Sequence, residues 1–151
     1  MRWEYPDKLH VTIAFLGDLT AQQVDEVKEL LRTAVRGYRP FTLAVRGVGA
    51  FPDENNPSVI WAGIAEAGTP LLEMQQKIED ELAGAGYRQD RRPFTAHITL
   101  GRPDRDGLAN TDWATITRAG DIDWGTVEVA AVHILESRSG RYYKLSEIPL
   151  N

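Results

Sequence analysis

A tetrapeptide of alternating chemistry occurs twice in this sequence, and it constrains the fold more than any other feature. His10-Val11-Thr12-Ile13 and His97-Ile98-Thr99-Leu100 both read histidine, apolar residue, threonine, apolar residue. Successive side chains of a β-strand point to opposite faces, so the histidine and threonine of each copy share one face and the apolar residues share the other. The repeat predicts two strands that each have an apolar side and a polar side carrying the same pair of groups.

Two segments have the pattern of amphipathic helices. Residues 19–37 place apolar side chains on one face, and Thr20 begins this segment in capping-box spacing. In residues 69–87, Thr69 stands at the expected N-cap, and Pro70 follows at the expected first helical position. The sequence therefore predicts one helix after the first histidine motif and one before the second.

The remaining segments predict hairpins and one loop. Residues 41–51 and 58–65 read as two strands joined by a turn, and residues 124–138 and 141–150 read as a second, longer hairpin. Residues 103–121 are polar and rich in turn residues, which predicts a loop with at most a short helix. Each half then holds one histidine strand, one helix and one hairpin. This order predicts an α+β fold with two similar lobes of antiparallel sheet, not a parallel doubly wound sheet.

Composition narrows the class of protein. A chain of 151 residues has the size of one domain, and it contains no cysteine for disulfides or thiolate metal sites. No run of apolar residues is long enough for a membrane span, so we expect none. The absence of cysteine suits a reducing compartment, so we expect a cytoplasmic protein. The net charge of −5 disfavours broad coating of nucleic acid, but arginines cluster around the second motif. This basic island predicts recognition of one small anionic group; its members are Arg88, Arg91, Arg92, Arg102 and Arg105.

The two polar faces suit proton transfer at a phosphate. One neutral imidazole can take a proton from water while one protonated imidazole gives a proton to a leaving group. The hydroxyls of Thr12 and Thr99 are short, stiff donors for anionic oxygens. His133 lacks a threonine partner, so we expect it to be structural, and a zinc site built from all three histidines is a minor alternative. The set predicts displacement at phosphorus without a metal or other cofactor.

These residues resemble the two-histidine (2H) phosphoesterases, which carry two such motifs. The segments "KLHVTIAFLG", "GVGAFPDENNPSVIWAGI", "PFTAHITLGR" and "ESRSGRYYKL" are similar to one branch of that superfamily, the RNA 2′,3′-cyclic phosphodiesterases, also called 2′-5′ RNA ligases or LigT-like proteins. The resemblance implies a bilobal α+β fold of two pseudo-symmetric antiparallel lobes with helices on their outer faces. It also implies an active-site cleft between the lobes.

The resemblance further implies hydrolysis of a 2′,3′-cyclic phosphate on RNA ends or nucleotides to a 2′-phosphate, with 2′-5′ ligation as the reverse reaction. His10 would be the general acid for the leaving 3′ oxygen, and His97 the base that activates water. Thr12 and Thr99 would hold the non-bridging oxygens. Three further residues are implied near the substrate: Arg102 beside the phosphate, and Phe51 and Phe94 beside the nucleobase. Base stacking is a second possibility for Trp61, where core packing is the first expectation.

Alternative functions and an altered chain start stay open. A related 2H enzyme for a small cyclic nucleotide or a 2′-5′ oligoadenylate has the same motifs, and so does a non-catalytic module that binds RNA ends. Only nine residues precede His10, whereas the resembled family begins with a strand and a helix. We therefore expect residues 1–151 to form a single 2H domain without that strand and helix. No obligate protein partner is expected, but Trp3 and Tyr5 would favour self-association and lower stability.

Overall fold

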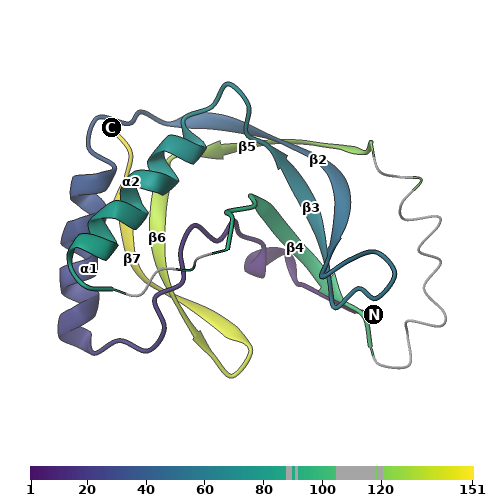
Figure 1. Cartoon of the computed structure of the whole chain (residues 1–151), viewed down its shortest axis with the longest axis horizontal. Helices are drawn as coiled ribbons and strands as arrows, with labels where there is room; N and C mark the ends of the chain where they lie inside the picture. The colour runs from purple at the N-terminus through teal and green to yellow at the C-terminus, as the bar shows by residue number, and fades with distance from the viewer. Residues whose placement is uncertain (88–89, 91, 105–117, 119–120) are drawn as a thin grey trace. The chain divides into compact units, whose positions relative to one another are not determined.

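The computed structural model describes residues 1–87, 90, 92–104, 118 and 121–151. The chain divides into two compact units, each assembled from three separate stretches of sequence. The first unit comprises Met1–Thr12, Leu43–Ala65 and Thr95–Val127, and the second comprises Ile13–Thr42, Glu66–Phe94 and Glu128–Asn151. Figure 1 labels the elements, which are β1 (Arg2–Trp3), a 3₁₀ turn (Pro6–Lys8), α1 (Ala21–Ala34), β2 (Phe41–Phe51), β3 (Val59–Ala65), α2 (Leu71–Gly84), β4 (His97–Arg102), β5 (Asp123–Val129), β6 (Ala131–Arg138) and β7 (Arg141–Pro149).

The first unit is built on a five-stranded sheet in the order β1-β4-β3-β2-β5. β3 pairs antiparallel with β2 on one side and with β4 on the other (Figure 1). Along β3, Ile60 and Ala62 are buried almost completely, whereas the intervening Trp61 is only partly buried. One face of the sheet therefore carries this unit's apolar core, and the opposite face carries Trp61.

Two register shifts bend this sheet. In β2 the pairing with β3 skips Gly47, whose φ of 75° is the left-handed conformation that glycine adopts without strain. In β4 the pairing skips Leu100, since Ile60 pairs with Gly101 while Trp61 pairs with Thr99. A one-residue bulge reverses the alternation of side chains beyond it. After Leu100, each residue of β4 therefore lies on the face opposite to the one that simple alternation from His97 predicts.

The second unit packs two helices with the β6–β7 hairpin. Thr20 caps α1 as its spacing predicts: its hydroxyl accepts from the backbone of Gln23, and the Gln23 side chain accepts from the backbone of Thr20. α1 and α2 lie side by side (Figure 1), and the apolar stripe of each helix is buried. Each large buried side chain contributes about 1.5–3 kcal/mol. The core residues of this unit are Val27, Leu31, Ala34, Val35, Leu71, Met74, Ile78, Leu82, Val132, Ile134, Ile148 and Leu150.

The expected α+β class and antiparallel pairing are confirmed, and so are both predicted helices and the 41–65 hairpin. α2 begins at Leu71 with Pro70 as its cap, one residue later than expected, because Pro70 has a non-helical ψ of 6°. Most of the expected loop at 103–121 lies outside the described residues. Among the described residues, no helix has the length and apolar composition needed to cross a bilayer.

Two expectations about the strands are wrong. The expected strand 124–138 is two strands, because the chain leaves the first sheet after Val129 and enters the β6–β7 hairpin at Ala131. The segment around His10 forms only an isolated bridge at Val11, because it lies along a short part of one edge of β4. The division of motifs also differs from that expected: the histidine and threonine of both motifs belong to the first unit, and both helices belong to the second.

Candidate active site

The two histidine motifs lie next to each other in the first unit. Val11 forms an antiparallel bridge with Ile98. In antiparallel pairing the neighbours of a bridged pair face each other, so this bridge places His10 across from Thr99 and Thr12 across from His97. All four side chains then share the face opposite to that of Val11 and Ile98. Each histidine is thus adjacent to the threonine of the other motif, and all four residues are partly buried.

Both imidazoles are oriented by the same type of hydrogen bond. His10 Nδ1 lies 2.7 Å from the carbonyl oxygen of Lys8, and the same atom of His97 lies 2.7 Å from the carbonyl oxygen of Thr95. A carbonyl oxygen can only accept, so Nδ1 is the protonated nitrogen in each ring. Nε2 is consequently the nitrogen whose protonation changes. Each backbone contact fixes the tautomer, so Nε2 is the ring nitrogen that can serve as a base or, once protonated, as an acid.

The two threonine hydroxyls complete this polar face. Within the part of the chain that the structure describes, neither the Thr12 nor the Thr99 hydroxyl makes a hydrogen bond to the protein. A hydroxyl donor left without a protein partner can donate to a ligand oxygen at no cost in internal bonds. β-Branching also restricts the rotation of each hydroxyl about χ1. The arrangement therefore offers two proton-transfer groups and two fixed donors on one face.

Aromatic rings support His97 on the same face. The Phe51 ring meets the His97 ring edge-on with centroids 5.0 Å apart, and the Trp61 ring lies 6.0 Å from His97. Phe51 and Trp61 also contact each other at 5.2 Å. The Trp61 indole lies over Gly49, where an added Cβ would be 2.2 Å from the ring. These contacts restrict the position of the His97 ring, and they depend on the absence of a side chain at residue 49.

We predict that Gly49→Ala displaces the Trp61 indole and thereby loosens His97. Overpacking of this kind costs about 1–3 kcal/mol in the free energy of unfolding. We expect turnover to fall roughly tenfold as well, since a small misplacement of a catalytic group has effects of that order or more. Chemical denaturation and initial-rate measurements on the same preparation check both values.

Gly84→Ala is the matched control, because an added Cβ at Gly84 meets no atom within 4 Å. Adding Trp61→Phe to the Gly49→Ala variant should restore part of the lost stability, because the phenyl ring is smaller than the indole. Unchanged stability and turnover in Gly49→Ala would show that the indole is not confined as the structure indicates.

The face that carries His10, Thr12, His97 and Thr99 is called the histidine face. Arg102 also lies on this face, because of the bulge at Leu100. Strict alternation from His97 would place Arg102 on the opposite face, but the skipped residue turns it to the side of Thr99. Its guanidinium donates from Nη1 to Glu4 Oε1 at 2.9 Å. The arginine expected beside the phosphate therefore shares a face with Thr99 and pairs with Glu4, a carboxylate that sequence reasoning did not single out.

The other predicted site residues are placed differently. Phe94 is partly buried and belongs to the second unit. Arg92 forms an ion pair with Asp90. Hydrogen bonds from the side chain and the backbone of Arg92 lower the pKa of the Asp90 carboxyl to about 2. The remaining arginines of the basic island (Arg88, Arg91 and Arg105) lie outside the described residues.

His133 lies in the second unit, and its Nε2 is 2.9 Å from Glu147 Oε1. This contact is consistent with the structural role expected for His133. In the described part of the chain, no three residues among His, Cys, Asp and Glu gather as metal ligands.

Sequence reasoning missed three contributions to the site. The carbonyls of Lys8 and Thr95 orient the histidines, but a backbone acceptor leaves no side-chain signal. Glu4 is remote in sequence from Arg102, so their pairing required the register of β1 against β4. Trp61 was expected mainly to pack in the core, yet its ring lies beside His97.

Two His-x-Thr motifs paired antiparallel, with all four polar side chains on one face, define the site of a two-histidine phosphoesterase. The profile of the 2′-5′ RNA ligase superfamily matches residues 4–141. The chain belongs to this superfamily.

Curated relatives and solved structures agree with this assignment. The RNA 2′,3′-cyclic phosphodiesterase of Archaeoglobus fulgidus is 32% identical over 133 residues, which cover 87% of this chain and 72% of the relative. The enzyme of the same name from Methanothermobacter thermautotrophicus is 29% identical over 136 residues, covering 87% and 71%.

Among solved structures, TT0787 of Thermus thermophilus shares the fold with a TM-score of 0.77 at 23% identity, over 99% of this chain and 81% of that chain. Escherichia coli LigT complexed with 3′-AMP matches with a TM-score of 0.69 at 25% identity, over 99% and 80%.

Proposed function

We propose that this protein hydrolyses 2′,3′-cyclic phosphates at RNA ends or on nucleotides to 2′-phosphates. The observation that carries the proposal is the bridge between Val11 and Ile98, which places His10, Thr12, His97 and Thr99 on one face. The names of the curated relatives support the same reaction. The 2′-5′ joining of RNA ends uses the same groups: a 5′ hydroxyl replaces water as the nucleophile, its oxygen forms the bond to phosphorus, and the bond to the 3′ oxygen breaks.

The reaction uses the two imidazoles in opposite protonation states. Neutral His97 takes a proton from water at Nε2 while the water oxygen forms a bond to phosphorus. Protonated His10 donates from Nε2 to the 3′ oxygen as the bond between that oxygen and phosphorus breaks. The products are a 2′-phosphomonoester and a free 3′ hydroxyl, and the two histidines exchange protons with solvent before the next cycle.

The threonine hydroxyls stabilise the charge that develops on the phosphate. Thr12 and Thr99 donate to the non-bridging oxygens, where negative charge increases in the transition state. Arg102 is on the same face and supplies a fixed positive charge. Phe51 and Trp61 limit movement of the general base His97, since both rings contact its imidazole.

Incubation with a nucleoside 2′,3′-cyclic phosphate tests the proposal, with the product identified by phosphorus NMR. We expect only the 2′-phosphate, and we expect the rate to be unchanged by a chelator, because the imidazoles and hydroxyls account for every proton transfer and oxygen contact. Formation of the 3′-phosphate would reverse the assignment of the leaving oxygen. Binding of the nucleotide without turnover would favour a non-catalytic RNA-end module, and cleavage of only a 2′-5′ oligoadenylate would favour a related 2H enzyme.

A further inference from the structure

A pocket of about 450 Å³ lies in the first unit beside the histidine face. Its volume falls within the range of small-molecule sites. Arg2 and Arg102 line one wall, and the loop between β2 and β3 lines the other through Asn56 and Ser58. The complete lining is Arg2, Pro52, Asn56, Pro57, Ser58, Arg102, Pro103 and Asp104. The pocket therefore combines two guanidinium groups with one carboxylate, that of Asp104, and with neutral polar side chains.

The two arginines are placed together by strand register. Arg2 of β1 is the direct partner of Arg102 of β4, so their side chains share a face. Like charges directly opposite each other in a sheet are destabilising. Each guanidinium has one carboxylate partner: Arg2 Nε is 3.3 Å from Asp104 Oδ1, and Arg102 Nη1 is 2.9 Å from Glu4 Oε1. The carboxylates offset the repulsion but leave other N–H donors on both guanidinium groups.

These ion pairs are weak enough for an anion to compete with them. The Arg2 side chain is 75% exposed and that of Arg102 is 46% exposed. Exposed ion pairs contribute little because water screens both charges, whereas a phosphodiester can accept hydrogen bonds from both guanidinium groups at once. A phosphodiester in the pocket can therefore accept from the remaining N–H donors of both guanidinium groups and compete with the two carboxylates.

The loop between β2 and β3, which lines one side of the pocket, is also connected to the histidine face. The backbone N–H and the hydroxyl of Ser58 both donate to the carbonyl oxygen of Phe51, at 2.7 and 3.1 Å. Asp53 Oδ1 accepts from the backbone N–H groups of Asn55 and Asn56. These two hydrogen bonds fix the turn at residues 53–56. Phe51 contacts His97, so one ordered segment forms both the aromatic support of the base and the wall of the pocket.

We propose that this pocket binds the phosphodiester that precedes the terminal nucleotide of an RNA substrate. This inference rests on the proposed function, in which the histidines and threonines hold the terminal cyclic phosphate. Arg102 supplies positive charge next to both phosphates, and Arg2 is the contact specific to the second one. A mononucleotide has no second phosphate, whereas an RNA chain carries one on the 5′ side of its last nucleotide. The pocket thus selects oligoribonucleotide ends over mononucleotides through charge-assisted contacts to the backbone, without reading the base.

The test compares two dinucleotides that end in a 2′,3′-cyclic phosphate. One has an ordinary phosphodiester between its nucleotides, and the other has a neutral methylphosphonate at that position. We expect kcat/KM to be roughly tenfold higher for the charged substrate, as a hydrogen bond to a charged group predicts. Arg2→Gln should reduce this ratio to near one, and raising the salt concentration should also reduce it.

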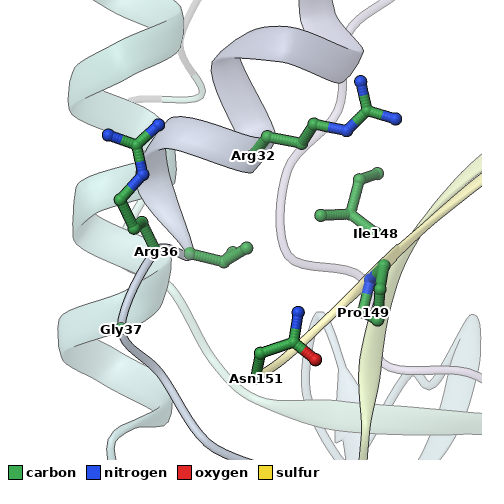
Figure 2. A pocket seen from close by; sticks show the side chains of 7 residues that line it. Arg32, Arg36, Gly37, Ile148, Pro149 and Asn151 are labelled. Carbon is green, nitrogen blue, oxygen red and sulfur yellow. The ribbon is translucent and has the colours of Figure 1, made fainter.

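Arg36→Gln is the matched control. Arg36 lines another pocket, of about 400 Å³, in the second unit. Figure 2 shows Arg32 extending from α1 and Arg36 extending from the turn after α1, in different directions. This variant should keep the wild-type ratio. Equal rates on the two dinucleotides, or an unchanged ratio in Arg2→Gln, would overturn the proposal.

Turnover of a nucleoside 2′,3′-cyclic phosphate separates this inference from the proposed function. If that substrate is hydrolysed and the dinucleotide ratio is one, the pocket assignment fails while the proposed function stands. If none of the three compounds is hydrolysed, the proposed function fails. In that case calorimetry measures the affinity of each dinucleotide. Roughly tenfold tighter binding of the charged dinucleotide would support the pocket assignment, and equal binding would overturn it.

Discussion

Replacing either catalytic histidine should reduce turnover by roughly 10²- to 10⁴-fold, the loss expected when a positioned acid or base is removed. This loss equals about 3–5 kcal/mol of activation free energy. His10→Ala and His97→Ala each remove one of two groups that act in the same step. Their combined effect should therefore be far smaller than the product of the single losses. Steady-state rates of the two single variants and the double variant with a nucleoside 2′,3′-cyclic phosphate measure these effects.

His133→Ala is the control for loss of a histidine. Its ring contacts Glu147 in the second unit and has no threonine partner. We expect its turnover to stay within a few-fold of wild type. Wild-type turnover in His10→Ala or His97→Ala would remove that residue from the mechanism.

Removing a threonine hydroxyl should have the next largest effect. Thr99→Val and Thr12→Val keep the branched shape of the side chain but lack the donor to a phosphate oxygen. A hydrogen bond to a charged group contributes about 1.5–3 kcal/mol, so each variant should lose roughly 10- to 100-fold in kcat/KM. The loss should be mainly in kcat, because charge on the non-bridging oxygens is greatest in the transition state.

The corresponding serine variants separate the hydroxyl from the methyl group. Thr99→Ser and Thr12→Ser retain a donor at the same position, so we expect them to keep most of the activity. Equal losses in the valine and serine variants would assign the threonines to packing and not to phosphate binding.

Much of the local structure could be predicted from sequence because its causes are local. Thr20 and the residue three positions later satisfy the backbone of α1 in the way their spacing predicts. The second expected hairpin leaves only Ser139 and Gly140 for its turn, and both residues adopt positive φ, at 51° and 74°. Such signals depend on neighbours along the chain and are unaffected by the rest of the fold.

The arrangement of the site depended on contacts between distant segments. The continuous apolar pattern around Ala130 contains no turn residue, so it did not reveal that Val129 and Ala131 belong to different sheets. The bulge at Leu100 is set by pairing with β3, and it decides which face Arg102 occupies. The motifs predicted which side chains share a face within each segment, but the register of Val11 with Ile98 was needed to bring the two segments together.

The dependence of kcat/KM on pH tests the central claim most directly, because the mechanism requires neutral His97 and protonated His10 at the same time. Wild type should give a bell-shaped profile whose limbs report the coupled pair. Protonation of the base lowers the rate on the acidic side, so His97→Ala should lose that limb. Deprotonation of the acid lowers the rate on the alkaline side, so His10→Ala should lose the other limb. A wild-type rate that rises to a plateau with pH, or a bell that survives in either variant, would contradict acid–base catalysis by this pair.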